Sequence, residues 1–265
     1  MADNSIMQDL LALSRQLGDP ERQWAILGEG NTSARVDDET FYVKASGSQL
    51  GKLMEQNVTH VRFAPILEAL HDSRDYNDAQ IKDLLYSSCV HNEKGLRPST
   101  ETVFHAFLLS LPDVNFVGHT HVISINGLMC SAHGWQAVKS GGRMFPDEIV
   151  VCGVAPCCVP YVDPGIPLAR ALRRAVLEYQ DRHGMRPKAI YMQNHGFTAL
   201  ARTAQEVENI HLMADKAAQI MLGAMACGGP AFLTTENVDR IFSRPDEHYR
   251  QRALGIKEDR PADGT

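Results

Sequence analysis

The amino-acid sequence predicts an α/β fold in a single large domain. Short runs of β-branched and aromatic residues, such as Thr40 to Val43 and residues 189–192, alternate with longer segments whose apolar residues recur every three or four positions. The 265 residues fit one such domain, and 44% hydrophobic residues are sufficient for its core. We expect residues 1–256 to form this domain and the polar residues 257–265 to be a disordered tail.

The composition argues against several classes of protein. A net charge of −6 without a lysine and arginine cluster argues against a nucleic-acid binder. No apolar run approaches the roughly 18 residues of a membrane span, and the first ten residues lack the basic and apolar regions of a signal peptide. Six cysteines without a C-x-x-C pattern indicate reduced thiols. We therefore expect a cytoplasmic protein that binds neither nucleic acid nor membrane.

The first helix is expected over residues 4–17, whose apolar residues have helical spacing. The Gly-Glu-Gly-Asn-Thr-Ser segment at 28–33 follows it. Successive N–H groups in a glycine turn form an anion-binding nest, and Asn31 adds a side-chain donor. A plain turn is the alternative interpretation of this segment.

A second loop of small residues follows the expected strand Thr40 to Val43. It contains Ser46 and Gly47, and loops at strand ends commonly contact ligands. Lys44 begins this loop and is interpreted as a solvated or phosphate-pairing lysine, with a Schiff-base nucleophile as the alternative.

Residues 50–98 carry less information. We expect a short strand at 60–63 and a short helix at 79–85. Three histidines in polar surroundings are expected to lie on the surface, namely His60, His71 and His91.

A helix is expected to begin near residues 97–101, with Ser99 or Thr100 as its N-cap, and to end at Pro112. Glu101 lies in the first turn, where the helix dipole favours a carboxylate. Two interpretations stay open for Glu101: an ordinary helix-start acid, or a carboxylate that faces a metal and transfers a proton. His105 lies on the same helical face, where a packed histidine is favoured over a ligand.

Residues 114–122 form an apolar strand that ends in two histidines. Side chains two positions apart leave the same face of a strand, so His119 and His121 project side by side. Neutral imidazole is the commonest protein ligand for zinc and similar ions. The pair therefore indicates half of a metal site, and chance occurrence is the alternative.

The strand at residues 189–196 repeats this pattern, because it ends in a histidine beside a glycine. His195 is the expected third ligand, and Asn194 and Gly196 allow a sharp turn there. Further strands are expected at 149–152 and 159–161, and a helix at 168–179 that Gly184 closes.

A capping box at residues 203–206 opens a long helix, whose His211 needs no special role. A last helical stretch is expected from about 236 to 254.

Five short motifs occur in the order Gly30-Asn31-Thr32-Ser33, Ser46-Gly47, Arg97-Pro98-Ser99-Thr100-Glu101, Gly118-His119-Thr120-His121 and Gln193-Asn194-His195-Gly196. Over about residues 5–230 this order resembles the class II aldolase/adducin family, in particular its fuculose-phosphate and ribulose-phosphate aldolases. The resemblance implies a three-layer α/β/α domain with a central, largely antiparallel sheet, usually assembled as a homotetramer.

The resemblance also implies roles for particular residues. His119, His121 and His195 would hold a divalent metal, most often zinc, with manganese or magnesium as alternatives. Glu101 matches the acid/base carboxylate, and Tyr161 resembles a tyrosine that enters a neighbouring subunit's site as a proton donor. The substrate-phosphate pocket of the family is matched by Asn31, Ser46, Gly47, Ser99 and Thr100.

The chain departs from the family pattern in three places. Residues 64–96 are longer than in the small sugar-phosphate aldolases, Thr100 stands where serine is common, and Ala45 stands where proline is common. The first departure affects the rim of the expected pocket, and the last affects the rigidity of its loop.

The function that the resemblance implies is reversible aldol cleavage of a ketose phosphate to dihydroxyacetone phosphate and an aldehyde. Decarboxylation of a β-keto acid and epimerisation of a pentose phosphate are the alternatives within the family. A non-catalytic adducin-like scaffold and a lysine-dependent aldolase using Lys44 are the alternatives outside this chemistry.

Overall fold

A computed structural model describes residues 2–92 and 95–245 of the chain. The strands are β1 (Asn31–Arg35), β2 (Thr40–Lys44), β3 (Val58–Arg62), β4 (Phe116–Thr120), β5 (Cys157–Val159), β6 (Ala189–Met192) and β7 (Gly196–Ala201). The α-helices are α1 (Ala2–Leu17), α2 (Phe63–His71), α3 (Asp78–Ser87), α4 (Thr102–Ser110), α5 (Ile123–Met129), α6 (Ala132–Lys139), α7 (Pro146–Cys152), α8 (Ile166–His183), α9 (Ala204–Ala226) and α10 (Thr235–Phe242). Two short 3₁₀ helices span Leu50–Lys52 and Glu55–Asn57.

The strands form one seven-stranded mixed sheet in the order β3-β2-β1-β4-β7-β6-β5. Neighbouring strands are antiparallel except β5 and β6, which are parallel. The expected largely antiparallel sheet is therefore confirmed. Strand β7, which begins directly after His195, was not predicted from the sequence.

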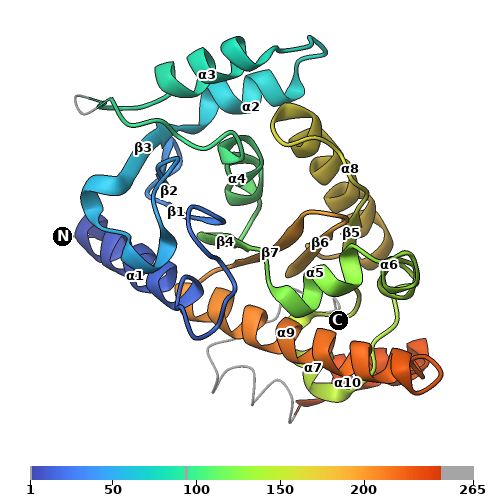
Figure 1. Cartoon of the computed structure of the whole chain (residues 1–265). Coiled ribbons are helices and arrows are strands. Elements are labelled where there is room, and N and C mark those ends of the chain that lie inside the picture. Colours follow the sequence, from blue (N-terminus) through green and yellow to red (C-terminus); the bar gives the residue numbers. More distant parts are fainter. Residues whose placement is uncertain (1, 93–94, 246–265) are drawn as a thin grey trace.

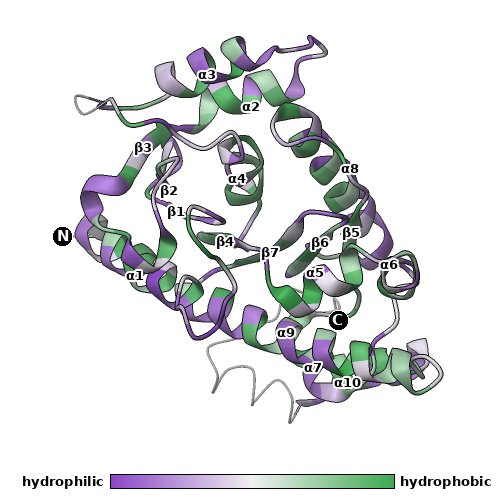
Figure 2. Ribbon diagram, in the orientation of Figure 1, coloured by the Kyte–Doolittle hydropathy of each residue, from purple (hydrophilic) through white to green (hydrophobic). Residues whose placement is uncertain are grey.

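Helices cover both faces of the sheet and give three layers (Figure 1). One hydrophobic core joins the sheet to α2, α4 and α8, and the other joins it to α1, α5 and α9. Strand β2 illustrates the alternation between the two cores, because Phe41 and Val43 enter the first core and Tyr42 the second. Helices α1 and α9 each carry both kinds of residue, and Figure 2 shows hydrophobic and hydrophilic residues alternating along them. This pattern is typical of helices that pack one face against a core. The three-layer α/β/α architecture is confirmed.

The expected strand at 149–152 is wrong, since these residues form the last turn of helix α7. An apolar run that is buried on every side has the same appearance in a strand and in a buried helix. Pro146 stands at the helix start and two acidic residues occupy the first turn, and both features are typical of a helix start.

Three smaller expectations also differ from the structure. The residue that caps α4 is Glu101, not Ser99 or Thr100, and its side chain makes no capping hydrogen bond. The last helix ends at Phe242 with Ser243 as its C-cap, and residues 246–254 of the predicted stretch lie outside the described residues, as does the tail at 257–265. His60 is half-buried, because its ring packs 4.8 Å from that of Tyr42 across the strand pair.

Among the helices of residues 2–92 and 95–245, none combines the length and the apolar character needed to cross a membrane.

Candidate metal centre

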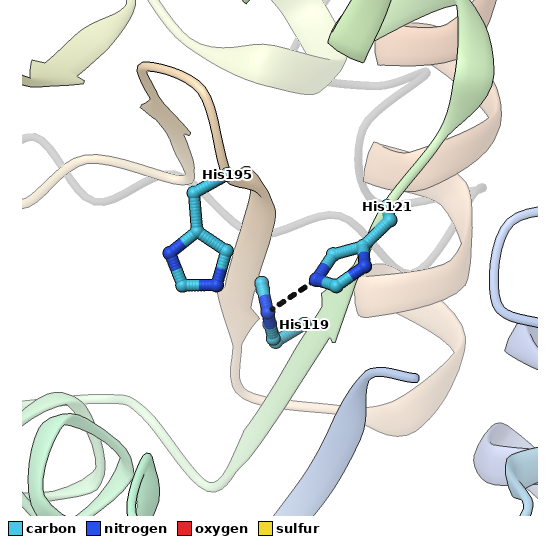
Figure 3. Close-up of side chains that lie close together, drawn as sticks. All are labelled: His119, His121 and His195. Carbon is cyan, nitrogen blue, oxygen red and sulfur yellow. Dashed lines mark hydrogen bonds between the residues drawn. The ribbon is translucent and has the colours of Figure 1, made fainter. Parts of the chain in front are cut away.

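The three predicted histidines come together at one end of strands β4 and β7. His119 is the fourth residue of β4, His121 lies just beyond its end, and His195 lies in the turn that connects β6 to β7. Because β4 pairs with β7 in the register Thr120 to Phe197, that turn lies beside the end of β4. One ligand atom from each histidine lies within 4.8 Å of the others. Figure 3 shows the three rings pointing toward one another.

The turn that carries His195 tolerates little extra volume. Asn194 adopts the left-handed conformation with φ 52°, which asparagine accepts more readily than most residues. A Cβ atom on Gly196 would lie 2.6 Å from the Thr120 carbonyl oxygen and 2.7 Å from the His121 ring. The sharp turn expected from Asn194 and Gly196 is confirmed, and glycine at 196 lets the two strand ends approach closely.

His119 is held in a fixed orientation and protonation state. Its Nδ1–H donates to the Phe197 carbonyl oxygen over 2.9 Å, which leaves the lone pair on Nε2. Burial lowers the pKa of His119 to about 3, so the ring is neutral at pH 7. Its Nε2 lies 3.3 Å from Nε2 of His121. Neutral imidazole nitrogens grouped in this way form a donor set that fits a divalent metal ion.

Glu101 faces the histidine cluster from the start of α4. Its Oε1 atom lies 2.9 Å from His195 Nε2 and 3.6 Å from His119 Nε2, while its Oε2 accepts from Asn31 Nδ2 over 2.5 Å. Burial by itself raises the pKa of the Glu101 carboxyl, but His119, His195 and the Asn31 hydrogen bond outweigh burial and hold this pKa below its ordinary value. An ionised carboxylate thus points at the place where the three imidazoles converge.

The loops predicted to hold the substrate phosphate lie close to one another. The Ser46 N–H donates to the Arg97 carbonyl oxygen over 2.7 Å, next to a bridge between Ala45 and Pro98. The Ser99 hydroxyl accepts from the Glu101 N–H over 3.3 Å. Contacts of a phosphate with the loops of Asn31, Ser46, Gly47, Ser99 and Thr100 stay a prediction.

Lys44 differs from its expected solvated state, since it is only 2% exposed. Its Nζ donates to the carbonyl oxygens of Gly28 and Ser48. Burial lowers the pKa of Lys44, and the nearby Glu101 carboxylate opposes this effect. The ammonium group therefore ties together the two glycine-containing loops beside the site.

Tyr161 lies just beyond β5 and is 54% exposed. Its hydroxyl donates to Asp163 over 3.0 Å, and this bond raises the pKa of Tyr161. Among the residues that the structure describes, no contact joins Tyr161 to the three histidines of its own chain. Its predicted role in a neighbouring subunit's site stays a prediction.

Two residues beside the site were not assigned to it by sequence reasoning. Glu29 Oε1 lies 3.7 Å from His121 Nδ1, and its Oε2 accepts from the Ile26 N–H over 3.0 Å. Asn126 Nδ2 donates to the His195 carbonyl oxygen over 3.1 Å. The sequence feature that could have pointed to Glu29 is its place between two glycines of a loop beside the site. No such feature marked Asn126, because helix α5 was not predicted.

The family profile described as "Class II Aldolase and Adducin N-terminal domain" matches residues 8–222. Together, a three-layer α/β/α fold and a histidine triad at the strand ends define a protein with a candidate metal centre. The chain belongs to the class II aldolase and adducin family.

Curated relatives carry two kinds of name. An uncharacterized oxidoreductase, YuxG of Bacillus subtilis, is 27% identical over 75% of this chain and 27% of its own length. A methylthioribulose-1-phosphate dehydratase of Geobacillus kaustophilus is 30% identical over 73% of this chain and 80% of its own length. A dehydratase of the same name from Microcystis aeruginosa is 30% identical over 42% of this chain and 44% of its own length. The chain thus spans less than half the length of YuxG and of the Microcystis protein.

Solved structures share the fold at low sequence identity. The N-terminal class II aldolase domain of a conserved protein from Thermoplasma acidophilum has a TM-score of 0.65 and 24% identity, covering 82% of this chain and 93% of that domain. An L-fuculose 1-phosphate aldolase has a TM-score of 0.63 and 18% identity, covering 91% of this chain and 96% of that enzyme.

Proposed function

We propose that this protein is a metal-dependent lyase that cleaves a ketose phosphate reversibly into dihydroxyacetone phosphate and an aldehyde. The observation that carries the proposal is the Glu101 carboxylate, whose Oε1 faces the Nε2 atoms of His195 and His119. A scaffold protein has no need of a buried carboxylate aimed into a histidine triad. The site therefore favours catalysis over the scaffold alternative.

The three histidines would hold a divalent ion, with zinc as the first candidate because three neutral imidazoles are a common zinc ligand set. When bound, the ion would supply Lewis acidity toward the hydroxyl and carbonyl oxygens of the substrate. Solution assays with zinc, manganese and magnesium would rank the three ions.

Glu101 would transfer the proton to and from C3 of the substrate. In cleavage, the bond between C3 and C4 breaks, the C4 hydroxyl loses its proton to form the aldehyde, and C3 gains a proton to complete dihydroxyacetone phosphate. In the reverse addition, we assign removal of the C3 proton to the ionised Glu101 and protonation of the aldehyde oxygen to Tyr161 of a neighbouring subunit. Cleavage starts from the protonated Glu101 and the ionised Tyr161 that addition leaves, and it returns one proton to C3 and one to Tyr161.

The phosphate of the substrate would bind the loops around Asn31, Ser46, Gly47, Ser99 and Thr100. Hydroxyl and N–H groups in these loops offer several donors to an anion. Anchoring the phosphate would place the reacting carbons beside Glu101 and the histidines.

Dehydration of a ketose phosphate is the second candidate function. It is favoured by the names of the dehydratase relatives, one of which is 30% identical over 200 residues. Both reactions require a proton transfer at C3, next to the carbonyl carbon, so the same carboxylate serves either one. They differ in the bond that breaks, which is carbon to carbon in one case and carbon to oxygen in the other.

Product analysis tests the proposal. Purified protein loaded with zinc would be incubated with a panel of ketose 1-phosphates, including methylthioribulose 1-phosphate. Aldol cleavage predicts dihydroxyacetone phosphate in equal amount to the aldehyde, whereas dehydration predicts a diketone with the carbon chain intact. Absence of both products across the panel would contradict the proposed function.

Glu101→Gln is the matched variant, because glutamine keeps the size and the acceptor for Asn31 but carries no exchangeable acid proton. We expect it to retain bound metal and to lose at least about 100-fold in turnover. Metal content would be measured by mass spectrometry alongside the rate. An unchanged rate in this variant would remove Glu101 from the proton transfer.

A further inference from the structure

Behind Glu101 lies a buried row of three polar side chains from two separate elements. Ser33 Oγ lies 2.7 Å from His105 Nδ1, and His105 Nε2 contacts Asn31 Oδ1. Asn31 Nδ2 in turn donates to Glu101 Oε2 over 2.5 Å. Ser33 and His105 are fully buried and Asn31 is nearly so. None of these contacts takes part in holding the three histidines together.

The local structure explains why these side chains meet. Asn31 and Ser33 are two positions apart on β1, so both leave the same face of the sheet. Glu101 and His105 are four positions apart at the start of α4, one helical turn from each other. Helix α4 packs on that face of the sheet, which places one residue from each pair against one from the other.

The chemistry of the groups fixes the direction of every hydrogen bond in the row. An ionised carboxylate only accepts, so the Asn31 amide presents its nitrogen to Glu101 and its oxygen to His105. An amide turned the other way would place its oxygen against the carboxylate. Asn31 Oδ1 therefore requires a proton on His105 Nε2. Burial lowers the pKa of His105 to about 4, so the ring is neutral and its Nδ1 accepts from the Ser33 hydroxyl.

We propose that Ser33 and His105 are positioning residues, which act through the Asn31 amide to hold the Glu101 carboxylate toward the histidine triad. Each donor in the row points in the direction of Glu101, so each bond supports the next. In this arrangement Glu101 Oε2 accepts the hydrogen bond from Asn31, and Glu101 Oε1 lies beside the histidines. The catalytic part of this inference rests on the proposed function, but the protonation of His105 does not.

The Asn31 amide carries a second N–H. Its contact with Glu101 is therefore compatible with the predicted contact to a substrate phosphate, and one side chain would link the two parts of the site.

The first test is a ¹⁵N nuclear magnetic resonance measurement of the histidine rings in the intact protein at pH 7. We expect His105 to show a protonated Nε2 and an unprotonated Nδ1, assigned by comparison with His105→Gln. In Ser33→Ala, where Nδ1 loses its donor, we expect the ring nitrogen shifts of His105 to change. A ring protonated on Nδ1 or on both nitrogens in the wild type would overturn the proposal, whatever the reaction catalysed.

The second test uses matched serine variants. Ser33→Ala removes the donor to His105, whereas Ser14→Ala removes a buried hydroxyl that contacts Thr32 and the Leu10 carbonyl oxygen instead. We expect kcat to fall about 10-fold in Ser33→Ala with KM and bound zinc unchanged, and to stay at the wild-type value in Ser14→Ala. Equal kcat values in the two variants would contradict the proposal.

His105 variants separate positioning from simple packing. Glutamine at 105 offers both a donor and an acceptor, so His105→Gln should retain more of kcat than His105→Leu. In a Glu101→Gln background, His105→Leu should cause no further loss, because it acts through the carboxylate. An equal loss in both backgrounds would overturn the proposal. If no lyase product forms at all, the proposed function fails while the resonance measurement still decides the protonation of His105.

Discussion

At the scale of single residues, the histidine cluster depends on the groups beside the far nitrogens of His119 and His121. Phe197 accepts from Nδ1 of His119, and Glu29 lies 3.7 Å from Nδ1 of His121. The hydrogen bond to Phe197 fixes the tautomer of His119, and the nearby Glu29 carboxylate favours a proton on Nδ1 of His121. The metal affinity of the site therefore depends on residues that would never touch the ion.

Glu29→Gln tests this dependence. We expect its zinc affinity to fall by roughly 10- to 100-fold, because the amide supports the His121 ring less strongly than the carboxylate. Competition with a zinc-binding dye would measure the affinity. Glu21→Gln, which removes an exposed carboxylate in the same part of the chain, is the control and should bind zinc as the wild type does.

His211 should make the free energy of unfolding depend on pH. Burial lowers its pKa to about 4, and its Nδ1 donates to the Val207 carbonyl oxygen. Because the unfolded ring takes up a proton near pH 6.5 and the folded ring does not, this residue's contribution to stability is complete above pH 6.5 and is lost as the pH falls toward 4. From pH 7 to pH 5 the loss amounts to about 2 kcal/mol.

We therefore expect the free energy of unfolding to depend less on pH in His211→Leu. Urea unfolding of metal-free protein at pH 7 and pH 5 would measure it. The difference between the two values should be smaller in the variant than in the wild type by about 2 kcal/mol. The same pH dependence in both proteins would contradict the assignment of His211 as a neutral buried ring.

At the scale of elements, the metal centre depends on how closely the turn between β6 and β7 approaches the end of β4. In Gly196→Ala the new Cβ would meet backbone oxygen and both His119 and His121 at 2.6 to 3.0 Å. We expect the turn to shift, with a loss of zinc affinity and a lower melting temperature. Calorimetry with and without zinc would report both effects.

Gly223→Ala is the matched control for this substitution. A Cβ at Gly223, in helix α9, would meet no atom within 4 Å. Alanine is favoured over glycine in a helix by about 1 kcal/mol, so this variant should be as stable as the wild type or more so, with the same zinc affinity. A Gly196→Ala protein that binds zinc normally would show that the close approach of the two strand ends is dispensable.

At the scale of the whole molecule, we propose that the site is completed by assembly. Tyr161 is exposed and bonds to Asp163, and exposed apolar residues on α5 and α9, namely Ile123, Leu212, Ile220 and Leu222, offer surfaces that a subunit contact would cover. Sedimentation analysis should find a homotetramer. A stable monomer at micromolar concentration would contradict this expectation.

Co-expression of two inactive variants tests whether Tyr161 serves a neighbouring site. We expect Tyr161→Phe and Glu101→Gln each to have low activity alone, since each lacks one proton-transferring group. Mixed oligomers would contain some sites with a native Glu101 from one chain and a native Tyr161 from another, so activity should reappear. No recovery in mixed oligomers confirmed by mass spectrometry would place Tyr161 outside the neighbour's site.

The amino-acid sequence by itself determined most of the local elements and the identity of the candidate ligands. Helical spacing, capping residues and strand alternation depend on neighbours only a few positions apart, which explains why α1, β2, α8 and the start of α9 were predictable. The same reasoning singled out His119, His121 and His195, because each stands at the end of an apolar strand. It failed at 149–152, where a fully buried run carries no periodicity that separates helix from strand.

Only the tertiary structure decided which of these groups meet. The register between β4 and β7 places the turn of His195 beside the end of β4, and the packing of α4 on β1 joins His105 and Ser33. Burial of Lys44 was decided in the same way, by two loops that fold over its ammonium group. Strand register and helix packing depend on contacts between residues far apart in the chain, and no local pattern specifies them.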